Sequence, residues 1–456
     1  MKDSYMDYKF SVIMPLYNVA EYLPDTIDSV LNQTIGFKEN IQLILVNDGS
    51  PDDVEPICLK YRDAYPDNIV YVYQENAGVS AARNAGMPYI RGMYTNFMDS
   101  DDIWGEDAFE KAWNMFEEYG DAIDVVACRM DYFEGKDGYH RLDFRYENGD
   151  MLCDIFEHPS YGQFAVCDCF CRSDAIADLS FDTRLSYGED AKFINQLILK
   201  KEKYGLLAGS IYHIRRRNAE TSLTQNKMHR RTAYLDTATY YYKYLVDLSK
   251  EKYGKVIPYI QYAVMNAIKY RVSSEIPDVI PKDIARQYID LTLDLIKQTD
   301  DEVLCDATNA NTGTKVYMLL LKHGMDALST ISYVKRGTLY VGGKKVGKLF
   351  RKNSFVISGV KKSLFKTEIT GTIMTPVIFK EFALEAFAGS TAYDCDVTLD
   401  KSDTRMSYRK DPMKRVYNFR VEIPTLKCRD YRKLKWVATT GVYKTTVKPA
   451  ITSSRP

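Results

Sequence analysis

The first 130 residues alternate short apolar runs with helical patterns, and this alternation limits the fold more than any other feature of the chain. The apolar runs lie at residues 10–16, 41–46, 70–73 and 94–98, and helical patterns follow each of them. Continuous apolar runs are typical of strands buried on both faces. Strand–helix–strand crossovers of this length indicate βαβ units. The pattern therefore predicts a parallel sheet with helices on both faces, which residues 124–128 continue.

The rest of the chain predicts two further regions. Residues 226–330 carry apolar residues at helical spacing, punctuated by prolines. From about residue 333 apolar and polar residues alternate, and turn signals recur at the spacing of β-sandwiches. We predict an α/β domain over residues 1–225, a helical linker domain over 226–330 and an all-β, immunoglobulin-like sandwich over 331–456.

Composition indicates where such a chain resides. No apolar run approaches the roughly 20 residues of a membrane span, and no basic-then-apolar signal precedes Tyr5. The nine cysteines are an odd number and are scattered, which favours reduced thiols over a disulfide framework. These features predict a protein that is made and kept in the cytoplasm.

The charge is divided unevenly along the chain. From Ser332 onward there are 26 lysines and arginines against 10 acidic residues, a balance of +16, while the remainder carries −17. Such asymmetry predicts an anionic partner for the basic part. We expect this partner to be an anionic polymer or the inner leaflet of the membrane, and we do not expect nucleic acid. A basic domain that is merely soluble is the alternative.

The fourth apolar run ends in Asp99-Ser100-Asp101-Asp102. This position is the carboxyl edge of a sheet, where open α/β sheets bind ligands. Carboxylates this close repel each other unless a cation lies between them. Mg²⁺ or Mn²⁺ fits, because it takes a few carboxylates and completes its shell with substrate phosphates. The alternative is a solvated N-cap of the following helix, since aspartate favours that position.

Polar residues also follow the other three strands. They include Tyr17 and Asn18 after the first strand, Asp48 after the second, and Asn76 and Arg83 after the third. These strand ends converge on one crevice, where Asp48 can accept hydrogen bonds from a base or ribose and the aspartate pair can hold metal and diphosphate. Neither a dinucleotide-binding glycine motif nor a P-loop is present.

These blocks resemble the nucleotide-binding half of the family 2 glycosyltransferases, inverting enzymes of GT-A (Rossmann-like) fold. The matching pieces are Ser-Val-Ile-Met-Pro-Leu-Tyr-Asn at 11–18, Val-Asn-Asp-Gly-Ser-Pro-Asp at 46–52, Glu-Asn-Ala-Gly-Val-Ser-Ala-Ala-Arg-Asn at 75–84 and Asp-Ser-Asp-Asp at 99–102. The resemblance continues at residues 187–190 and 212–217. With its C-terminal β-domain, the chain looks more narrowly like wall teichoic acid and surface polysaccharide glycosyltransferases.

The resemblance implies a role for each matching position. It assigns the uridine pocket to Pro15, Tyr17, Asp48, Asn76 and Arg83, and the metal and diphosphate motif to Asp99, Ser100 and Asp101, with Asp101 as the more direct ligand of Mn²⁺ or Mg²⁺. It makes Asp190 the catalytic base, places Glu189 near the sugar or acceptor, and makes Arg215 and Ser222 diphosphate-side contacts of a closing loop.

This sequence departs from the family at one metal position. The family often carries a histidine just after the arginine of that loop, where this chain has Arg217 and Asn218. The nearby histidine is His213, which is either a metal ligand or a packed core histidine.

Two further features are open. Cys167, Cys169 and Cys171 would share one face of a strand, as a metal site or as a small-residue face near the acceptor. The run Tyr240–Tyr242 and residues 229–231 could touch membrane lipid or could belong to ordinary helix packing.

An inverting transfer needs a metal and an arginine for the leaving diphosphate and one base for the acceptor hydroxyl. We therefore predict an inverting hexosyl- or N-acetylhexosaminyltransferase that uses a UDP-sugar and a teichoic acid, capsular polysaccharide or exopolysaccharide acceptor. A dimer or trimer through the β-domain and contact with the inner face of the membrane are open alternatives. One rival is a sugar-1-phosphate nucleotidylyltransferase, whose glycine-rich opening loop is absent. The other is a catalytically silent GT-A module for binding or assembly.

Overall fold

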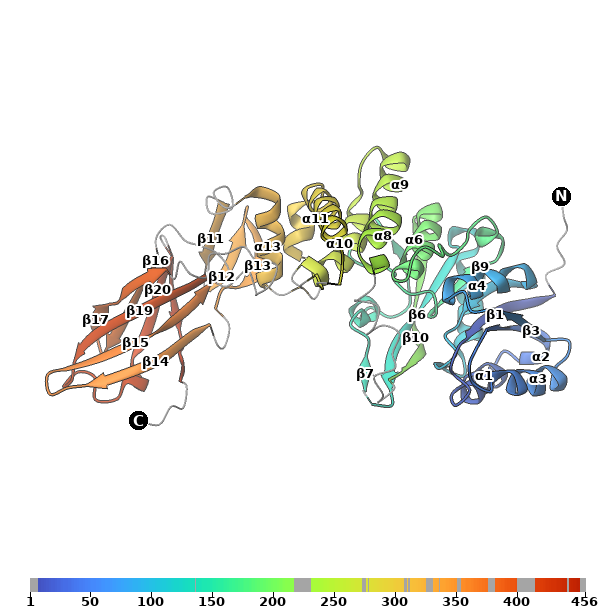
Figure 1. Ribbon diagram of the computed structural model, residues 1–456, viewed down its shortest axis with the longest axis horizontal. Helices are drawn as coiled ribbons and strands as arrows, with labels where there is room; N and C mark the ends of the chain where they lie inside the picture. Colours follow the sequence, from blue (N-terminus) through green and yellow to red (C-terminus); the bar gives the residue numbers. More distant parts are fainter. Residues whose placement is uncertain are drawn as a thin grey trace. The chain divides into compact units, whose positions relative to one another are not determined.

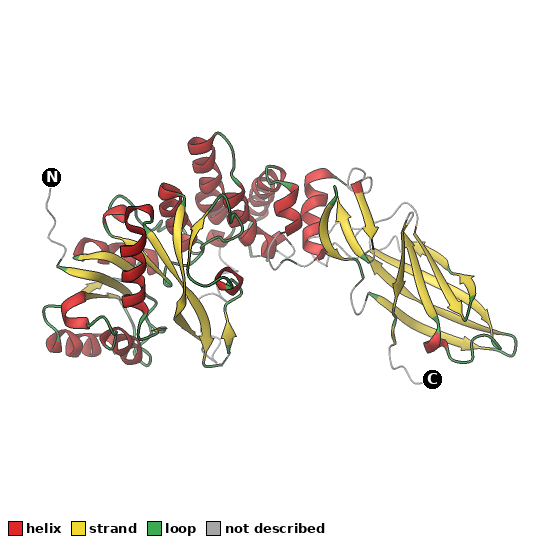
Figure 2. Ribbon diagram, turned by 180° about the vertical axis from the view of Figure 1, so that it is seen from behind, coloured by secondary structure: helices red, strands yellow, loops and turns green. Residues whose placement is uncertain are grey.

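The chain folds into two compact units, shown in the computed structural model of Figures 1 and 2. The first comprises Met1–Ala263 and Asp278–Tyr288, and the second comprises Val264–Pro277 and Ile289–Pro456. The structure describes residues 7–135, 137–216, 231–272, 276–277, 279–306, 310, 312–324, 331–335, 337–350, 354–375, 382–399, 415–440 and 443–451. The three-domain division drawn from the sequence stays a prediction.

The first unit is built on one mixed sheet. Its strands run in the order β3-β2-β1-β4-β9-β6-β10-β5, with β7 beside β6 and β8 beside β10. Their bounds are β1 Tyr8–Leu16, β2 Ile41–Asp48, β3 Ile69–Gln74, β4 Gly92–Phe97, β5 Ile103–Trp104, β6 Val125–Phe133, β7 Gly138–Tyr139, β8 Met151–Asp154, β9 Cys169–Arg172 and β10 Lys203–Arg215. The first four pair in parallel, as the sequence predicts.

The sheet departs from the predicted parallel continuation at β9. This strand lies between β4 and β6 and is antiparallel to both. Asn96 explains the arrangement, because its buried side-chain amide donates to the carbonyl oxygens of Cys167 and Cys169, both at 2.8 Å. The strand is short and no helix leads into it, so the periodicity of the sequence does not reveal it.

Helices and aromatic side chains complete the first unit. The helices are α1 Leu23–Leu31, α2 Phe37–Asn40, α3 Val54–Ala64, α4 Val79–Gly86, α5 Ala108–Tyr119 and α6 Glu189–Lys201, with shorter turns η1 Met87–Tyr89, η2 Gly120–Ala122, η3 Asp143–Tyr146 and η4 Asp174–Ile176. Phe170 of β9 packs edge-on against Phe10 and Phe109, with ring centroids 5.2 and 4.9 Å away. Such aromatic pairs bury much apolar area, so β9 is held in the core of the sheet.

Residues 231–323 are largely helical. They form η6 Arg231–Ala233, α8 Leu235–Thr237, the π-helical η7 Ala238–Lys243, α9 Tyr244–Tyr253, α10 Pro258–Val272, α11 Lys282–Lys297, α12 Asp301–Asp306 and α13 Thr312–His323. Tyr241 and Tyr242 are buried, which favours helix packing over lipid contact for these two, while His229 and Arg230 lie outside the described residues. A separate helical linker domain stays a prediction. Among the helices described, none is both long and apolar enough to span a membrane.

The C-terminal part is all β, as predicted. Three sheets have the orders β11-β12-β13, β18-β19-β15-β14-β22 and β17-β16-β20-β21. The bounds are β11 Ser332–Lys335, β12 Thr338–Val341, β13 Lys344–Lys348, β14 Phe355–Lys362, β15 Lys366–Thr375, β16 Phe382–Ala388, β17 Thr391–Asp394, β18 Asp396–Leu399, β19 Arg415–Pro424, η9 Tyr431–Lys433, β20 Lys435–Thr440, β21 Tyr443–Val447 and β22 Ala450–Ile451. Phe355, Phe419 and Trp436 meet in a core shared by the two larger sheets. The immunoglobulin-like topology stays a prediction.

Candidate functional site

The predicted site residues collect at the carboxyl edge of the parallel strands. Strand order reverses at β1, which has β2 on one side and β4 on the other. The carboxyl end of such a switch point is where open α/β sheets bind ligands. The loops after β1, β2, β3 and β4 all leave this edge, and the start of α6 and the end of β10 join them through the contacts described below.

Arg83 is the centre of this cluster. It is buried on α4, and its guanidinium donates to Asp190 Oδ1 and, at 3.1 Å, to Asp99 Oδ1. Glu189 lies 3.9 Å from the same group. Although burial disfavours the charged form, Asp190 and Asp99 together hold the pKa of Arg83 above its ordinary value. The structure thus joins the predicted base to the predicted metal carboxylate through one permanently charged side chain.

Local structure fixes the positions of both Arg83 on α4 and its partner Asp190 on α6. Asn84 exchanges two hydrogen bonds with the backbone of Phe181, both at 2.8 Å, and the Phe181 ring lies 5.1 Å from the Arg83 guanidinium carbon. Gly188 precedes α6 with φ +85°, and a Cβ there would collide with the ring of Tyr241. A glycine is therefore required at the turn that presents Glu189 and Asp190 at the start of the helix.

The acidic turn after β4 is not a helix N-cap. Helix α5 has Asp107 at its N-cap, so the alternative drawn for the aspartates does not hold. Asp99 is 39% exposed, and its N–H donates to the hydroxyl of Tyr212 at 3.1 Å. Asp102 is buried, and its pKa is raised well above the ordinary value by burial and by the neighbouring Asp101 and Asp99. Asp99 and Asp101 are therefore the partly exposed carboxylates of the turn, and Asp102 is the buried one.

Arg215 braces this turn from β10. Its N–H donates to Asp102 Oδ1 at 2.9 Å and its Nε donates to the Asp101 carbonyl at 2.8 Å. The rest of the guanidinium contacts Glu134 at 2.5 Å and Asp25 at 3.3 Å. In this conformation Arg215 holds the acidic turn in place. Its predicted contact with a diphosphate is untested, and Ser222 lies outside the described residues.

Asp48 at the end of β2 shapes the loop that leads to α4. One carboxylate oxygen accepts from Gln74 Nε2 at 2.6 Å and from the Ala77 N–H at 2.8 Å, and the other accepts from the Gly78 N–H at 2.9 Å. Asn76 donates to the Asp48 carbonyl at 3.1 Å. Asp48 therefore positions the loop from which Arg83 projects.

The loops after β1 and β2 are joined to each other. The Asn18 N–H donates to Ser50 Oγ at 2.8 Å, and the Ala20 N–H donates to Asp52 Oδ2 at 2.7 Å. Tyr17 is 43% exposed beside this junction, and Pro15 is half-buried within β1. An exposed aromatic ring on a braced loop can stack on a planar ligand.

The site fits a divalent cation that brings its own oxygen ligands. Asp99, Asp101, Asp102, Glu189 and Asp190 outnumber the cationic groups around them, Arg83 and Arg215. Among the described residues no three metal-ligating side chains converge. Mg²⁺ and related ions often take one or two carboxylates and complete their shell with substrate phosphates, so the donor set suits a cation that binds together with a nucleotide.

The remaining candidate metal ligands are His213 and the cysteines at positions 167, 169 and 171. His213 Nδ1 is 2.7 Å from Asp131 Oδ1, and the His213 side chain is 32% exposed, so it is not a packed core histidine. No contact found among the described residues joins it to Asp99. Cys167 precedes β9 rather than lying on it, and Cys169 and Cys171 are buried on the strand. Burial raises the pKa of all three thiols, which disfavours the thiolate that metal binding needs.

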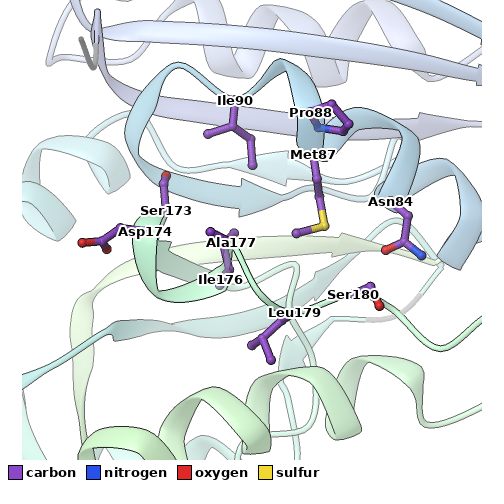
Figure 3. Close-up of a pocket in the computed structure, with 10 residues that line it drawn as sticks. All are labelled: Asn84, Met87, Pro88, Ile90, Ser173, Asp174, Ile176, Ala177, Leu179 and Ser180. Carbon is purple, nitrogen blue, oxygen red and sulfur yellow. The ribbon is translucent and has the colours of Figure 1, made fainter. Parts of the chain in front are cut away.

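A separate cavity lies beside the end of α4. It has a volume of about 540 Å³ and is lined by residues of α4, η1 and the segment 173–180, including Asn84, Met87, Ile176 and Leu179 (Figure 3). None of the predicted site residues within the described ranges lines it.

The contacts of Arg83 and Arg215 are what sequence reasoning missed. The resemblance predicts a place in the uridine pocket for Arg83 and a diphosphate contact for Arg215, and both roles stay predictions. What the sequence does not indicate is that both side chains bind carboxylates of the chain. Tyr212, Phe181 and Glu134 were not singled out as supports. The acidic residues themselves were visible as strand and helix ends, but nothing in the sequence pairs them with a particular arginine.

Comparison with known proteins shows which family and which curated proteins this chain resembles. Residues 11–176 match the family described as Glycosyl transferase family 2. The minor teichoic acid biosynthesis protein GgaB of Bacillus subtilis is 37% identical over 357 residues, which cover 76% of this chain and 39% of GgaB. The minor teichoic acid biosynthesis protein GgaA of the same organism is 32% identical over 329 residues, covering 71% of this chain and 74% of GgaA. The chain therefore spans well under half of GgaB.

Solved structures share the fold. Staphylococcus aureus TarS superposes with a TM-score of 0.52 at 15% identity, covering 98% of this chain and 78% of TarS. TarS 1–349 in complex with UDP-GlcNAc superposes with a TM-score of 0.54 at 17% identity, covering 73% of this chain and 96% of that one. At these identities the likeness shows a common fold.

Proposed function

This chain belongs to glycosyl transferase family 2, and from that membership we propose that it is an inverting transferase. The proposed reaction moves a hexosyl or N-acetylhexosaminyl group from a UDP-sugar to a hydroxyl group of a teichoic acid or another anionic surface polysaccharide. The observation that carries the proposal is Arg83 bound to both Asp99 and Asp190 at the carboxyl edge of the sheet. The teichoic acid names of GgaA and GgaB support the acceptor class, and the UDP-GlcNAc complex of TarS supports the donor class.

Asp99 and Asp101 are the proposed ligands of Mn²⁺ or Mg²⁺. When bound, such an ion neutralises charge that develops on a leaving diphosphate. The chain's own part is to hold the acidic turn: Arg215 fixes the backbone of Asp101 and the carboxylate of Asp102, and Tyr212 accepts the Asp99 N–H. Ser100, whose carbonyl accepts from Thr26 Oγ1 at 3.1 Å, is held in the same turn.

Asp190 is the proposed base. It would take the proton of the acceptor hydroxyl at a carboxylate oxygen while the hydroxyl oxygen bonds to the anomeric carbon and the diphosphate leaves with the bonding electron pair. Its place at the start of α6 favours the ionised form, because a helix N-terminus stabilises negative charge. Arg83 holds the carboxylate in position through Oδ1. Glu189, buried beside it, is proposed to lie near the sugar or acceptor.

The uridine is proposed to lie over the loops after β1, β2 and β3. Tyr17 and Asn76 are exposed there, and Pro15, two residues before Tyr17, is half-buried. Asp48 orients the loop and can accept further hydrogen bonds, because carboxylate oxygens have about four acceptor sites. Arg215 and Ser222 remain proposed diphosphate contacts of a closed form.

The basic C-terminal part is proposed to attract the anionic acceptor. From residue 332 onward the balance is +16, and attraction of this kind raises the local concentration of a polyanion. Assembly into a dimer or trimer through this part stays a prediction.

The test is release of UDP from a panel of UDP-sugars in the presence of MnCl₂ and a teichoic acid acceptor. We expect turnover with one donor, lost in Asp190→Asn and kept in Asp178→Asn, a matched exposed aspartate that pairs with Lys200. A catalytically silent module would bind a UDP-sugar, seen as a rise in melting temperature, without releasing UDP from any donor. That result would overturn the proposed reaction.

A further inference from the structure

The turn between β14 and β15 carries two large apolar side chains into solvent. Leu364 is 83% and Phe365 is 81% exposed, at the end of the hairpin drawn in orange in Figure 1. The Ser363 N–H donates to the Lys366 carbonyl at 2.8 Å, and the Lys366 N–H donates back to Ser363 Oγ at 3.1 Å. Tight turns favour glycine, asparagine and aspartate, so packing within the turn gives no reason for a Leu–Phe pair.

A second turn lies directly beside the first. It follows β19 and carries Leu426, which is also 81% exposed. The Thr425 N–H donates to the Phe365 carbonyl at 3.1 Å, and Thr425 Oγ1 donates to the Ser363 carbonyl at 2.9 Å. Leu364, Phe365 and Leu426 therefore project from two turns that are bonded to each other, and we call these three residues the apolar tip.

Basic residues surround the apolar tip. The segments 361–366 and 424–433 contain one acidic residue, Asp430, against the following exposed lysines and arginines, which we call the basic ring: Lys361, Lys362, Lys366, Lys427, Arg429, Arg432 and Lys433. Lys366 pairs with Glu422 and Arg432 with Asp430. Within the described part of the chain, Lys361, Lys427, Arg429 and Lys433 form no ion pair.

We propose that the apolar tip and the basic ring bind an anionic lipid bilayer. The tip would enter the boundary between headgroups and acyl chains, while the ring meets the phosphates of the headgroups. An anionic polysaccharide could pair with the charges of the basic ring, but it has no hydrocarbon that could cover the apolar tip. A second copy of the chain would bring two basic rings together, which is unfavourable. An anionic bilayer matches both the charge and the apolar surface.

The test is flotation of the full chain with vesicles at physiological salt. One set is phosphatidylcholine alone and the other contains 30 mol% phosphatidylglycerol. We expect binding to the second set. The variant Leu364→Ser/Phe365→Ser/Leu426→Ser should bind at least about tenfold more weakly, because it removes the three apolar side chains that the bilayer would take out of water. Phe365→Trp should bind like the wild type, and brominated lipids should quench the added tryptophan. Neither measurement uses a sugar donor or turnover, so the outcome is independent of the proposed reaction.

Matched variants make the test specific. Val279→Ser removes an exposed apolar residue elsewhere and should leave binding unchanged. Lys361→Gln/Lys427→Gln should weaken binding about tenfold, and Lys345→Gln/Lys348→Gln, which removes the same charge outside the ring, should not. Equal vesicle binding by the triple serine variant would overturn the proposal, even if the lysine variants bind less. The proposal would also be overturned if the triple serine variant no longer self-associated in light scattering but still floated with the vesicles. The apolar tip would then be a contact between copies of the chain.

Discussion

Charges are used in opposite ways by the crevice of the first unit and by the basic β-sheet part of the second. In the crevice, Arg83 and Arg215 are both buried, and each binds at least two acidic residues or their backbone at defined distances. In the β-sheet part, Lys366 and Arg420 are about half exposed, and both pair with Glu422 at the surface. A buried charged side chain is stable only when its partners lie in one defined arrangement. An exposed charged side chain can be replaced in its role by a neighbouring one of the same sign.

The difference predicts how each region responds to mutation and to salt. Removing one partner of a buried pair leaves an uncompensated charge, which is strongly unfavourable. An exposed ion pair contributes about 0–1 kcal/mol and is screened by salt. We therefore expect single substitutions around Arg83 to abolish turnover, and single substitutions in the basic region only to weaken binding of an anionic partner in part.

The largest effect is expected at the acidic turn. Asp101→Ala, or an excess of EDTA with the wild type, should reduce UDP-sugar turnover below detection, because a diphosphate and several carboxylates cannot share the site without a cation. The measurement is UDP release with and without added Mn²⁺. Asp107→Ala is the control, because Asp107 lies in the same segment and pairs with Lys111 at the surface, so its loss should cost at most about 1 kcal/mol of stability and leave turnover unchanged. Full turnover in EDTA would remove the metal from the mechanism.

Asp190→Asn comes next. It should lower turnover by about 10²–10⁴-fold, the usual contribution of a general base, while UDP affinity stays the same. Steady-state kinetics and calorimetric titration with UDP separate the two quantities. If turnover remains near that of the wild type, the base lies elsewhere, and Glu189, 3.9 Å from Arg83, is the next candidate.

The sequence predicted the acidic residues of the crevice better than it predicted their partners. Asp48, Asp99 and Asp190 each follow a strand or open a helix, and chain order alone brings such ends to one edge of a parallel sheet. Arg83 is different, since its partners lie in the turn after β4 and on α6, 16 and 107 positions away in sequence. Pairing over such a separation depends on packing, which periodicity does not encode.

The fold shows the same limit. The parallel half follows from local patterns, whereas β9 inserts between β4 and β6 with only four residues, Cys169–Arg172. Its place is fixed by the Asn96 amide and by the ring of Phe170, both contacts with distant parts of the chain. In the β-sheet part, alternation revealed the strands but not that Leu364 and Leu426 meet at neighbouring turns.

A smaller effect is expected from a buried carboxylate outside the crevice. Asp168 is fully buried and accepts from Gln163 Nε2 at 2.8 Å, and burial raises its pKa to about 6. Between pH 4 and 6 the folded chain keeps this proton and the unfolded chain releases it, so the free energy of unfolding falls as pH rises. A shift of this size corresponds to about 2–3 kcal/mol.

Asp168→Asn isolates this contribution, because an amide does not titrate. The stability of the wild type relative to the variant should fall by about 2 kcal/mol from pH 4 to 7 and then stay level, as measured by urea unfolding at each pH. Asp178→Asn is the control of opposite sign. A hydrogen bond from Lys200 lowers the pKa of exposed Asp178, so the wild type should gain slightly over that variant as pH rises through 4. Parallel profiles for Asp168→Asn and wild type would show that Asp168 is ionised throughout.

The smallest effects per residue are expected in the basic region. There the loss of binding should not depend on which lysines are removed, and this is the sharpest contrast with the residues around Arg83. Attraction of an anionic polymer acts over a Debye length of about 8 Å at physiological salt, so it depends on the number of lysines more than on where each one lies. With soluble polyphosphate as the probe, Lys345→Gln/Lys348→Gln and Lys361→Gln/Lys427→Gln should weaken binding equally, by about two- to fivefold. Affinity should fall steeply between 50 and 300 mM salt for the wild type and both variants. If one pair alone accounts for the loss, the basic region contains a defined polyanion site, and its charges act through specific geometry as those around Arg83 do.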